Sequence, residues 1–268
     1  IERKTWTVVP KPKGKKVVLS LWAFKRKLCS DGSHRRHKAR LTLRGDIQKM
    51  WKRADVTGPD DKKSRSMREA AEKDETCAPV AQWSTIRFLL TLTCICKLQT
   101  LQMDFGNAFA QADLPEPVCM LLPRDFHVDA SVKQCPDQEM CLKLHKNLHG
   151  SVDAPRLLCE MFRDGMLKRG FTCSSNDPCL FHNDKVMAVC YVDDVLWFSK
   201  EESDIRNVLQ SFTDDGDEHK WEHTVEGSVS AFLGIDVEEL DDGGWKLTQS
   251  GLINDILETT KMTECSSK

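Results

Sequence analysis

The sequence predicts an α+β fold for its 268 residues, and three patterns support this prediction. Residues 186–190 and 195–198 are apolar, rich in β-forming side chains and separated by a short acidic turn, which is typical of a β-hairpin. Residues 85–98 and 154–169 instead carry apolar side chains at helical spacing. A chain of this length can bury a sizeable core as one large or two smaller domains.

The N-terminal part of the chain is predicted to be mainly strand. Residues 5–9 and 16–27 are rich in β-forming side chains, and a polar turn at 28–38 leads to a further strand at 39–43. Residues 55–75 are dense in charge and poor in apolar side chains. We therefore expect an exposed insertion there, with a helical stretch at 66–73.

The next segment is predicted to alternate between helix and strand. The helix at 85–98 has its apolar spacing at Ile86, Leu89, Leu90 and Thr93, so we expect it to lie under a sheet. An apolar segment then ends at Asp104, and residues 107–112 are predicted as a short helix after Gly106. Pro115-Glu116-Pro117 is expected to break the chain before a strand at 118–122.

The C-terminal half is predicted to contain one long helix and two hairpins. The helix at 154–169 stops at Gly170, and its buried side is expected to consist of Leu157, Leu158, Met161, Phe162 and Met166. Residues 232–240 and 244–249 are predicted to form the second hairpin through the turn at 241–244.

Three aspartates are predicted to meet at one point. Asp193 and Asp194 occupy the tip of the first hairpin, and Asp104 ends a strand that the intervening helices allow to lie beside it. Carboxylate oxygens are ligands that Mg²⁺ prefers, and two such ions about 3.5–4 Å apart suit displacement at phosphorus. The alternative for the Asp-Asp pair is an acidic turn on a surface hairpin.

The charge distribution is uneven although the formal net charge is only −2. Residues 1–53 hold 17 lysines and arginines against three acidic residues, so the remainder of the chain is strongly acidic. This asymmetry indicates a basic arm that contacts phosphates, joined to an acidic body that holds metal ions. A lysine-rich solvated face is the alternative.

The 12 cysteines follow no paired CxxC spacing, so a zinc site is not expected. His145 and His149 stand four residues apart without a nearby Glu or Cys to complete a ligand set. We interpret the cysteines as small buried side chains in a reducing compartment. No apolar run approaches the roughly 20 residues of a transmembrane helix, so no membrane insertion is expected.

The chain resembles the reverse transcriptase domain of copia-type LTR-retrotransposon Pol polyproteins. The resemblance is carried by Asp104 with Ala108-Phe109, by Tyr191-Val192-Asp193-Asp194, and by four further segments in the family's order, over nearly the whole chain from about Trp6 to Leu257. These segments are Lys38-Ala39-Arg40-Leu41 with Arg44-Gly45, Ala78-Pro79-Val80 with Thr85-Ile86-Arg87, Leu148-His149-Gly150 with Ala154-Pro155-Arg156, and Phe232-Leu233-Gly234-Ile235 with Leu247-Thr248-Gln249.

The resemblance implies a polymerase right hand with a ferredoxin-like βαββαβ palm. Residues 1–97 are expected to be mainly fingers with the charged insertion, and residues 98–249 palm with an interleaved fingers segment at about 118–150 and a primer-grip hairpin at 232–249. Residues 250–268 would begin the thumb. The implied reaction is RNA-directed DNA synthesis by nucleotidyl transfer with two Mg²⁺ or Mn²⁺ ions.

The implied partners are an RNA or DNA template with its primer, deoxynucleoside triphosphates, and the RNase H and integrase domains of a parent polyprotein. The implied location is intracellular, in a cytoplasmic particle or the nucleus.

The resemblance also assigns roles to single residues. Asp104, Asp193 and Asp194 would form the catalytic metal constellation, with Phe105 lending its backbone carbonyl. The nucleotide-binding residues would be Lys38, Arg40, Phe109 and Asp153, of which Phe109 would obstruct a 2′-hydroxyl. The residues expected at the nucleic acid are Arg156, Tyr191, Val192, Phe232, Leu233 and Gly234. Core packing is the alternative for Phe109, and a solvated helix surface for Arg156.

Two positions depart from the family. Asp153 stands where the family carries a glutamine against the incoming nucleotide, and His149 replaces a tyrosine. A carboxylate near a triphosphate is unfavourable, which predicts either an impaired copy that only binds nucleic acid or an Asp153 that instead caps the helix beginning near Pro155. A metal-dependent nuclease is a further alternative, disfavoured because no His or Lys general acid accompanies the aspartates.

Overall fold

The computed structural model describes residues 4–28, 34–49, 77–128, 139–213, 220–241 and 244–262. The chain divides into two compact units, the first made of residues 1–79 and 107–164 and the second of residues 80–106 and 165–268. The charged insertion predicted at 55–75 lies outside the described residues. Both units combine strands and helices, so the α+β class is confirmed.

The described residues of the first unit form two sheets. Strands β1 (Trp6–Pro10), β6 (Met140–Lys146) and β5 (Asp113–Leu121) form one antiparallel sheet in the order β1-β6-β5. Strands β2 (Ser20–Leu28) and β3 (His34–Leu43) form a separate two-stranded antiparallel ribbon. The hydrophobic cluster of the first unit contains residues of both sheets. It consists of Val18, Leu43, Met120, Leu142, Leu144 and Leu148.

Two boundaries in the first unit correct the sequence prediction. Strand β3 begins at His34, so residues 34–38 are strand and not turn, because each of them except Arg35 pairs with a residue of β2. Strand β5 runs through Pro115 and Pro117, which were expected to break the chain. It is an edge strand with an irregular register between Asp113 and Val118, and both features accommodate residues that lack an N–H donor.

Two glycines of the first unit allow its segments to approach closely. A Cβ on Gly45 would lie 2.0 Å from the carbonyl oxygen of Gly150, and a Cβ on Gly150 would lie 2.2 Å from that of Leu43. The Leu43 N–H donates to the His149 carbonyl over 2.8 Å, and Gly150 has a φ of +84°. Side chains at either glycine would therefore separate two backbones that are hydrogen-bonded here.

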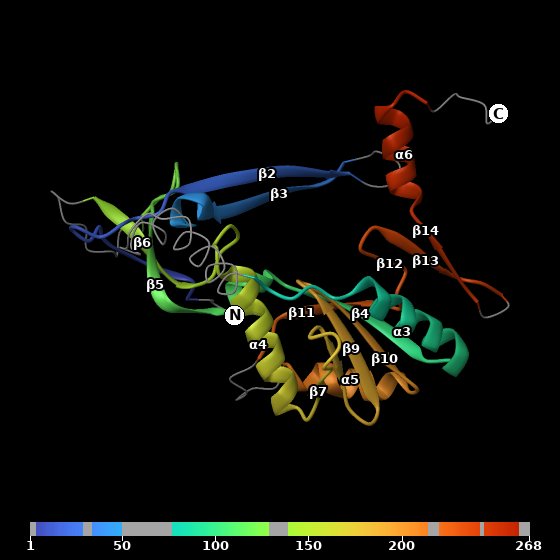
Figure 1. The fold of residues 1–268 in the computed structure, drawn as a ribbon. Helices are drawn as coiled ribbons and strands as arrows, with labels where there is room; N and C mark the ends of the chain where they lie inside the picture. The colour runs from blue at the N-terminus through green and yellow to red at the C-terminus, as the bar shows by residue number, and fades with distance from the viewer. Residues whose placement is uncertain are drawn as a thin grey trace, which may run out of the picture. The chain divides into compact units, whose positions relative to one another are not determined.

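The second unit is built on a six-stranded sheet in the order β11-β4-β10-β9-β8-β7 (Figure 1). Its strands are β4 (Gln99–Phe105), β7 (Thr172–Cys173), β8 (Leu180–His182), β9 (Val186–Tyr191), β10 (Asp194–Ser199) and β11 (His223–Gly227), and all neighbours are antiparallel. Helix α4 (Ala154–Lys168) lies between β4 and β9 in the sequence, after the 3₁₀ turn η1 (Ala108–Gln111), and helix α5 (Glu202–Ser211) lies between β10 and β11. Strands β4, β9, β10 and β11 thus follow the βαββαβ order with the spatial sequence 4-1-3-2, so the ferredoxin-like prediction is confirmed.

Helices cover both faces of this sheet. Helix α3 (Trp83–Cys96) buries Ile86, Leu89, Leu90 and Thr93, the residues that helical spacing predicted. Leu196 and Phe198 of β10 belong to the same apolar cluster as α3. Trp197 of β10 points to the opposite face of the sheet, since successive strand residues face opposite sides. Its ring contacts Phe171, which precedes β7, and Phe212, which follows α5.

The predicted 232–240 strand is interrupted. Strand β12 (Ala231–Phe232) ends at Phe232, and Leu233 and Gly234 turn the chain with φ values of 54° and 77° before β13 (Ile235–Glu239). Strands β13 and β14 (Trp245–Thr248) form the hairpin expected over the second half of the segment. Helix α6 (Ser250–Thr259) follows.

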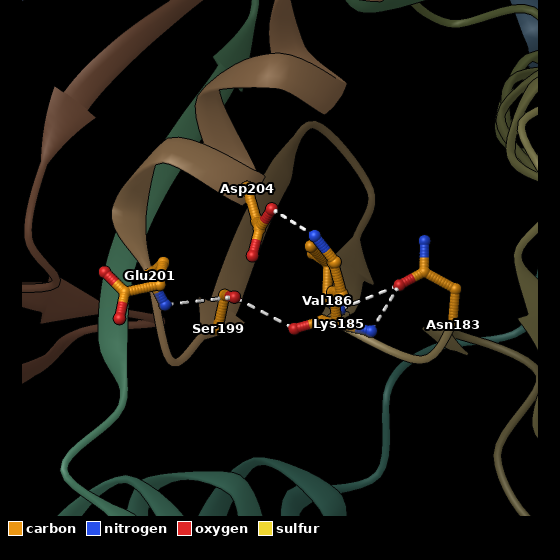
Figure 2. A network of polar contacts seen from close by, with 6 residues as sticks. All are labelled: Asn183, Lys185, Val186, Ser199, Glu201 and Asp204. Atoms are coloured by element: carbon orange, nitrogen blue, oxygen red, sulfur yellow. Dashed lines mark hydrogen bonds and ion pairs between the residues drawn. The ribbon is translucent and has the colours of Figure 1, made fainter.

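A polar network fixes the end of β9 and β10 that is remote from the acidic turn (Figure 2). The Asn183 carboxamide oxygen accepts the backbone N–H groups of Lys185 and Val186, and the Ser199 hydroxyl donates to the Lys185 carbonyl over 2.9 Å. The Lys185 ammonium lies 3.2 Å from the Asp204 carboxylate at the start of α5. These contacts hold the β8–β9 turn, β10 and α5 together.

The cysteines correct part of the sequence prediction. Among the nine described cysteines, all of which are free, only Cys141 and Cys179 are buried, while Cys77 and Cys96 are exposed. Burial raises the pKa of the Cys141 thiol to about 11, with the neighbouring Cys119 as the second cause, so it stays protonated at neutral pH. Along the described chain, no helix has the length and apolarity needed to span a bilayer.

Candidate active site

The three predicted aspartates lie at one end of the β4–β10 strand pair. Asp104 of β4 is directly opposite Asp194 of β10, and the Phe105 N–H donates to the Asp193 carbonyl over 2.9 Å. The convergence predicted from the sequence is therefore present. Because Asp104 and Asp194 face each other across the ladder, their side chains share one face of the sheet.

The acidic turn is tight and strained. Tyr191 pairs with Asp194, so Val192 and Asp193 alone connect β9 to β10. Val192 has a φ of 59°, which a β-branched residue adopts at a cost of about 1–3 kcal/mol. The bond from Phe105 to the Asp193 carbonyl holds the turn against β4 and offsets part of this strain.

The charges around Asp194 oppose its ionisation. Burial is the largest cause that raises the pKa of the Asp194 carboxyl to about 6, and the negative charges of Asp193, Asp104 and Glu226 contribute the rest of the increase. Sequence reasoning missed Glu226, which lies in β11. The available signal was the glycine that follows it, because a glycine inside a strand pattern often marks a bulge.

The donor chemistry of this site fits Mg²⁺. Among the described residues, no three His, Cys, Asp or Glu side chains lie close enough to make a ready ligand set. Mg²⁺ does not require one, since it commonly binds through one or two carboxylates and completes its octahedron with water and substrate phosphates. The like-charge repulsion at Asp194 is a cost that a divalent cation would remove.

The side chain of Phe232 belongs to the core of the second unit. It is 3% exposed, packs in the cluster with α3, and meets the Tyr191 ring edge-on at 6.5 Å. Its ring therefore has no surface to offer to a nucleic acid, which corrects the expectation for that side chain. The turn at Leu233 and Gly234 stays a predicted contact, and a Cβ on Gly234 would meet nothing within 4 Å.

Phe109, Asp153 and Arg156 lie in the first unit. The half-buried Phe109 packs edge-on against His149 with ring centroids 5.0 Å apart. The Asp153 carbonyl accepts the Leu157 N–H over 3.0 Å, so Asp153 occupies the N-cap position of α4. Arg156 binds Glu160 one turn along the helix at 2.7 Å.

Lys38 and Arg40 lie two residues apart in β3, so they share a face of the ribbon. Lys38 is opposite Lys25 of β2, and Arg40 is opposite Ala23. Like charges directly opposite each other in a ladder are destabilising. A bound polyanion would relieve this repulsion.

Comparison with known families decides which family the chain represents. The model of the family described as "Reverse transcriptase (RNA-dependent DNA polymerase)" matches residues 62–268. The chain belongs to this family. The resemblance inferred from the motifs is therefore confirmed, and this reverse transcriptase family includes domains of retrotransposon Pol polyproteins.

Several relatives of this reverse transcriptase sequence are Pol polyproteins. The retrovirus-related Pol polyprotein from transposon RE1 of Arabidopsis thaliana is 30% identical over 98% of this chain, and that from transposon TNT 1-94 of Nicotiana tabacum is 30% identical over 74%. The transposon Ty1-ER2 Gag-Pol polyprotein of Saccharomyces cerevisiae is 24% identical over 70%. The chain spans only 16%, 13% and 9% of these three polyproteins.

Solved structures with a similar backbone include a telomerase from Candida tropicalis, with a TM-score of 0.46 and 9% identity over 92% of this chain and 46% of that one. A foamy viral protease-reverse transcriptase has a TM-score of 0.39 and 13% identity over 97% of this chain and 34% of that one.

Proposed function

We propose that this chain catalyses RNA-directed DNA synthesis, in which a primer 3′-hydroxyl attacks the α-phosphate of a deoxynucleoside triphosphate. The observation that carries the proposal is the pairing of Asp104 with Asp194 beside the Asp193 turn. Membership of the reverse transcriptase family supports it.

Asp104 and Asp193 would hold two Mg²⁺ or Mn²⁺ ions, with Asp194 as the third carboxylate and the Phe105 carbonyl as a further oxygen ligand. Bound divalent cations would lower the pKa of the attacking hydroxyl and neutralise charge on the departing pyrophosphate. The strained Val192 turn keeps Asp193 at the sheet end, where its carboxylate can serve this role.

The remaining roles follow the family. Lys38 and Arg40 would bind the triphosphate, Phe109 would exclude a 2′-hydroxyl, and Asp153 would lie near the nucleotide. The primer and template would contact Arg156, Tyr191, Val192, Leu233 and Gly234.

The proposed subdomains are fingers over 1–97 and about 118–150, palm over the rest of 98–249 with the primer grip at 232–249, and the start of a thumb at 250–268. The proposed partners also include RNase H and integrase domains of a parent polyprotein.

A primer-extension assay on an RNA template with Mg²⁺ or Mn²⁺ tests the proposal. Asp104→Asn and Asp193→Asn should each reduce the rate by a factor of about 10³ or more, since an amide cannot neutralise a cation and a loss of about 4 kcal/mol in transition-state stabilisation has that effect. Asp184→Asn is the matched control, because Asp184 is an exposed carboxylate at the other end of β9. Equal rates for wild type and Asp104→Asn would refute the assignment.

An impaired copy that only binds nucleic acid is the second candidate, and the carboxylate of Asp153 at the position of the family's glutamine favours it. A carboxylate that faces the triphosphate would oppose nucleotide binding. This candidate predicts salt-sensitive binding of a primer–template duplex without any nucleotide incorporation.

A further inference from the structure

Strand β11 contains a bulge beside the three aspartates. Thr224 pairs with Asp104 and Val225 with Met103, but the next pair joins Gly227 to Gln102. Glu226 is therefore the extra residue of β11 with no partner of its own on β4. Bulges near active sites re-aim one side chain and are commonly retained for that reason.

The pairing register places Glu226 close to the aspartates. Gln102 and Asp104 share a face because they are two residues apart in one strand. Thr224 lies on this face opposite Asp104, and Glu226 follows two residues further along β11, next to Met103 and Gln102. Its side chain is exposed, and its charge acts on Asp194 together with those of Asp104 and Asp193.

We propose that Glu226 is a fourth carboxylate of the active site, a positioning residue that strengthens the binding of divalent cations held by Asp104 and Asp193. This inference rests on the proposed function and extends it to a residue outside the aspartate motif. Glu226 acts through its charge, because a nearby anion attracts a divalent cation across several ångströms of solvent. At such separations in water, this attraction corresponds to about a fivefold change in affinity.

Titration of the protein with Mn²⁺, without nucleic acid or nucleotide, tests this role by calorimetry or by the electron paramagnetic resonance signal of free Mn²⁺. Glu226→Gln should weaken Mn²⁺ binding about fivefold, and Glu226→Lys should weaken it further because the charge is reversed. Glu201→Gln is the matched control, since Glu201 is also exposed but follows the far end of β10, about 17 Å of strand away from Asp194. Its Mn²⁺ affinity should equal that of the wild type.

The same titration separates this inference from the proposed function. If Asp104→Asn abolishes binding while Glu226→Gln and Glu226→Lys bind like the wild type, the aspartate site stands and the role of Glu226 is refuted. If the wild type binds no Mn²⁺, or Asp104→Asn binds equally well, both proposals are refuted. In primer extension, Glu226→Gln should raise the Mg²⁺ concentration needed for half-maximal rate and leave the rate at saturating Mg²⁺ near that of the wild type.

The urea midpoint of each Glu226 variant shows whether the fold is intact. A lower Mn²⁺ affinity at an unchanged midpoint supports the charge-based role. A lower affinity that appears only in Glu226→Lys and with a lowered midpoint would be a structural effect and would overturn it.

Discussion

Replacing Gly165 of α4 by alanine should destabilise the second unit. A Cβ built on Gly165 lies 2.3 Å from Cζ2 and 2.6 Å from Cη2 of Trp221, whereas carbon atoms in contact prefer about 3.5–4.0 Å. The Trp221 ring would have to move by about 1 Å or more. It is 1% exposed and packed between Phe212 at 4.4 Å and Phe105 at 5.6 Å, so it has no space for this movement.

The size of the effect follows from two opposing contributions. Overpacking of a buried core costs about 1–3 kcal/mol and sometimes more. Alanine is favoured over glycine by about 1 kcal/mol inside a helix. The free energy of unfolding should therefore fall by up to about 2 kcal/mol.

Gly251 in α6 supplies the matched control, because a Cβ there meets nothing within 4 Å. Gly251→Ala should leave the unfolding free energy unchanged or raise it by up to about 1 kcal/mol. Urea denaturation should separate the two variants by roughly 1 M in midpoint at typical slopes. Midpoints that shift in the same direction for both variants would refute the packing argument.

Three further predictions concern the proposed polymerase. Phe109→Ala should admit ribonucleotides in single-nucleotide incorporation, and unchanged selectivity would indicate that Phe109 serves only to pack against His149. Asp153→Gln should lower the apparent KM for nucleotide if the carboxylate faces the triphosphate; a melting temperature lowered by the loss of about 1 kcal/mol without kinetic gain would identify a helix cap instead. Phe232→Ala should cost about 3–5 kcal/mol of stability by urea denaturation, and a cost under about 1 kcal/mol would contradict its burial in the core.

Local periodicity predicted several elements accurately. The spacing of Ile86, Leu89, Leu90 and Thr93 gave the buried face of α3, because one helix turn brings such residues to the same side whatever they pack against. The β9–β10 hairpin followed from two apolar arms around a two-residue turn. Both patterns lie within short stretches of the chain, so neighbouring residues suffice to specify them.

The errors arose where pairing with a distant segment decided the conformation. Polar residues 34–38 form strand because β2 supplies their hydrogen bonds. Pro115 and Pro117 remain in strand because β5 is the edge of its sheet. In both cases the local composition favours a turn or a break, and the place of the segment in its sheet overrides it.

The sequence by itself determined which residues are available for metal chemistry: Asp104 at a strand end and the adjacent Asp193 and Asp194 next to a hairpin turn, with the family motifs around them. Only the tertiary structure decided that Asp104 lies opposite Asp194, that Phe232 is core, and that β11 brings Glu226 close to the aspartates. The physical reason is that side-chain spacing is local, whereas the register between strands depends on contacts between segments far apart in the chain. A shift of one residue would turn each side chain to the opposite face.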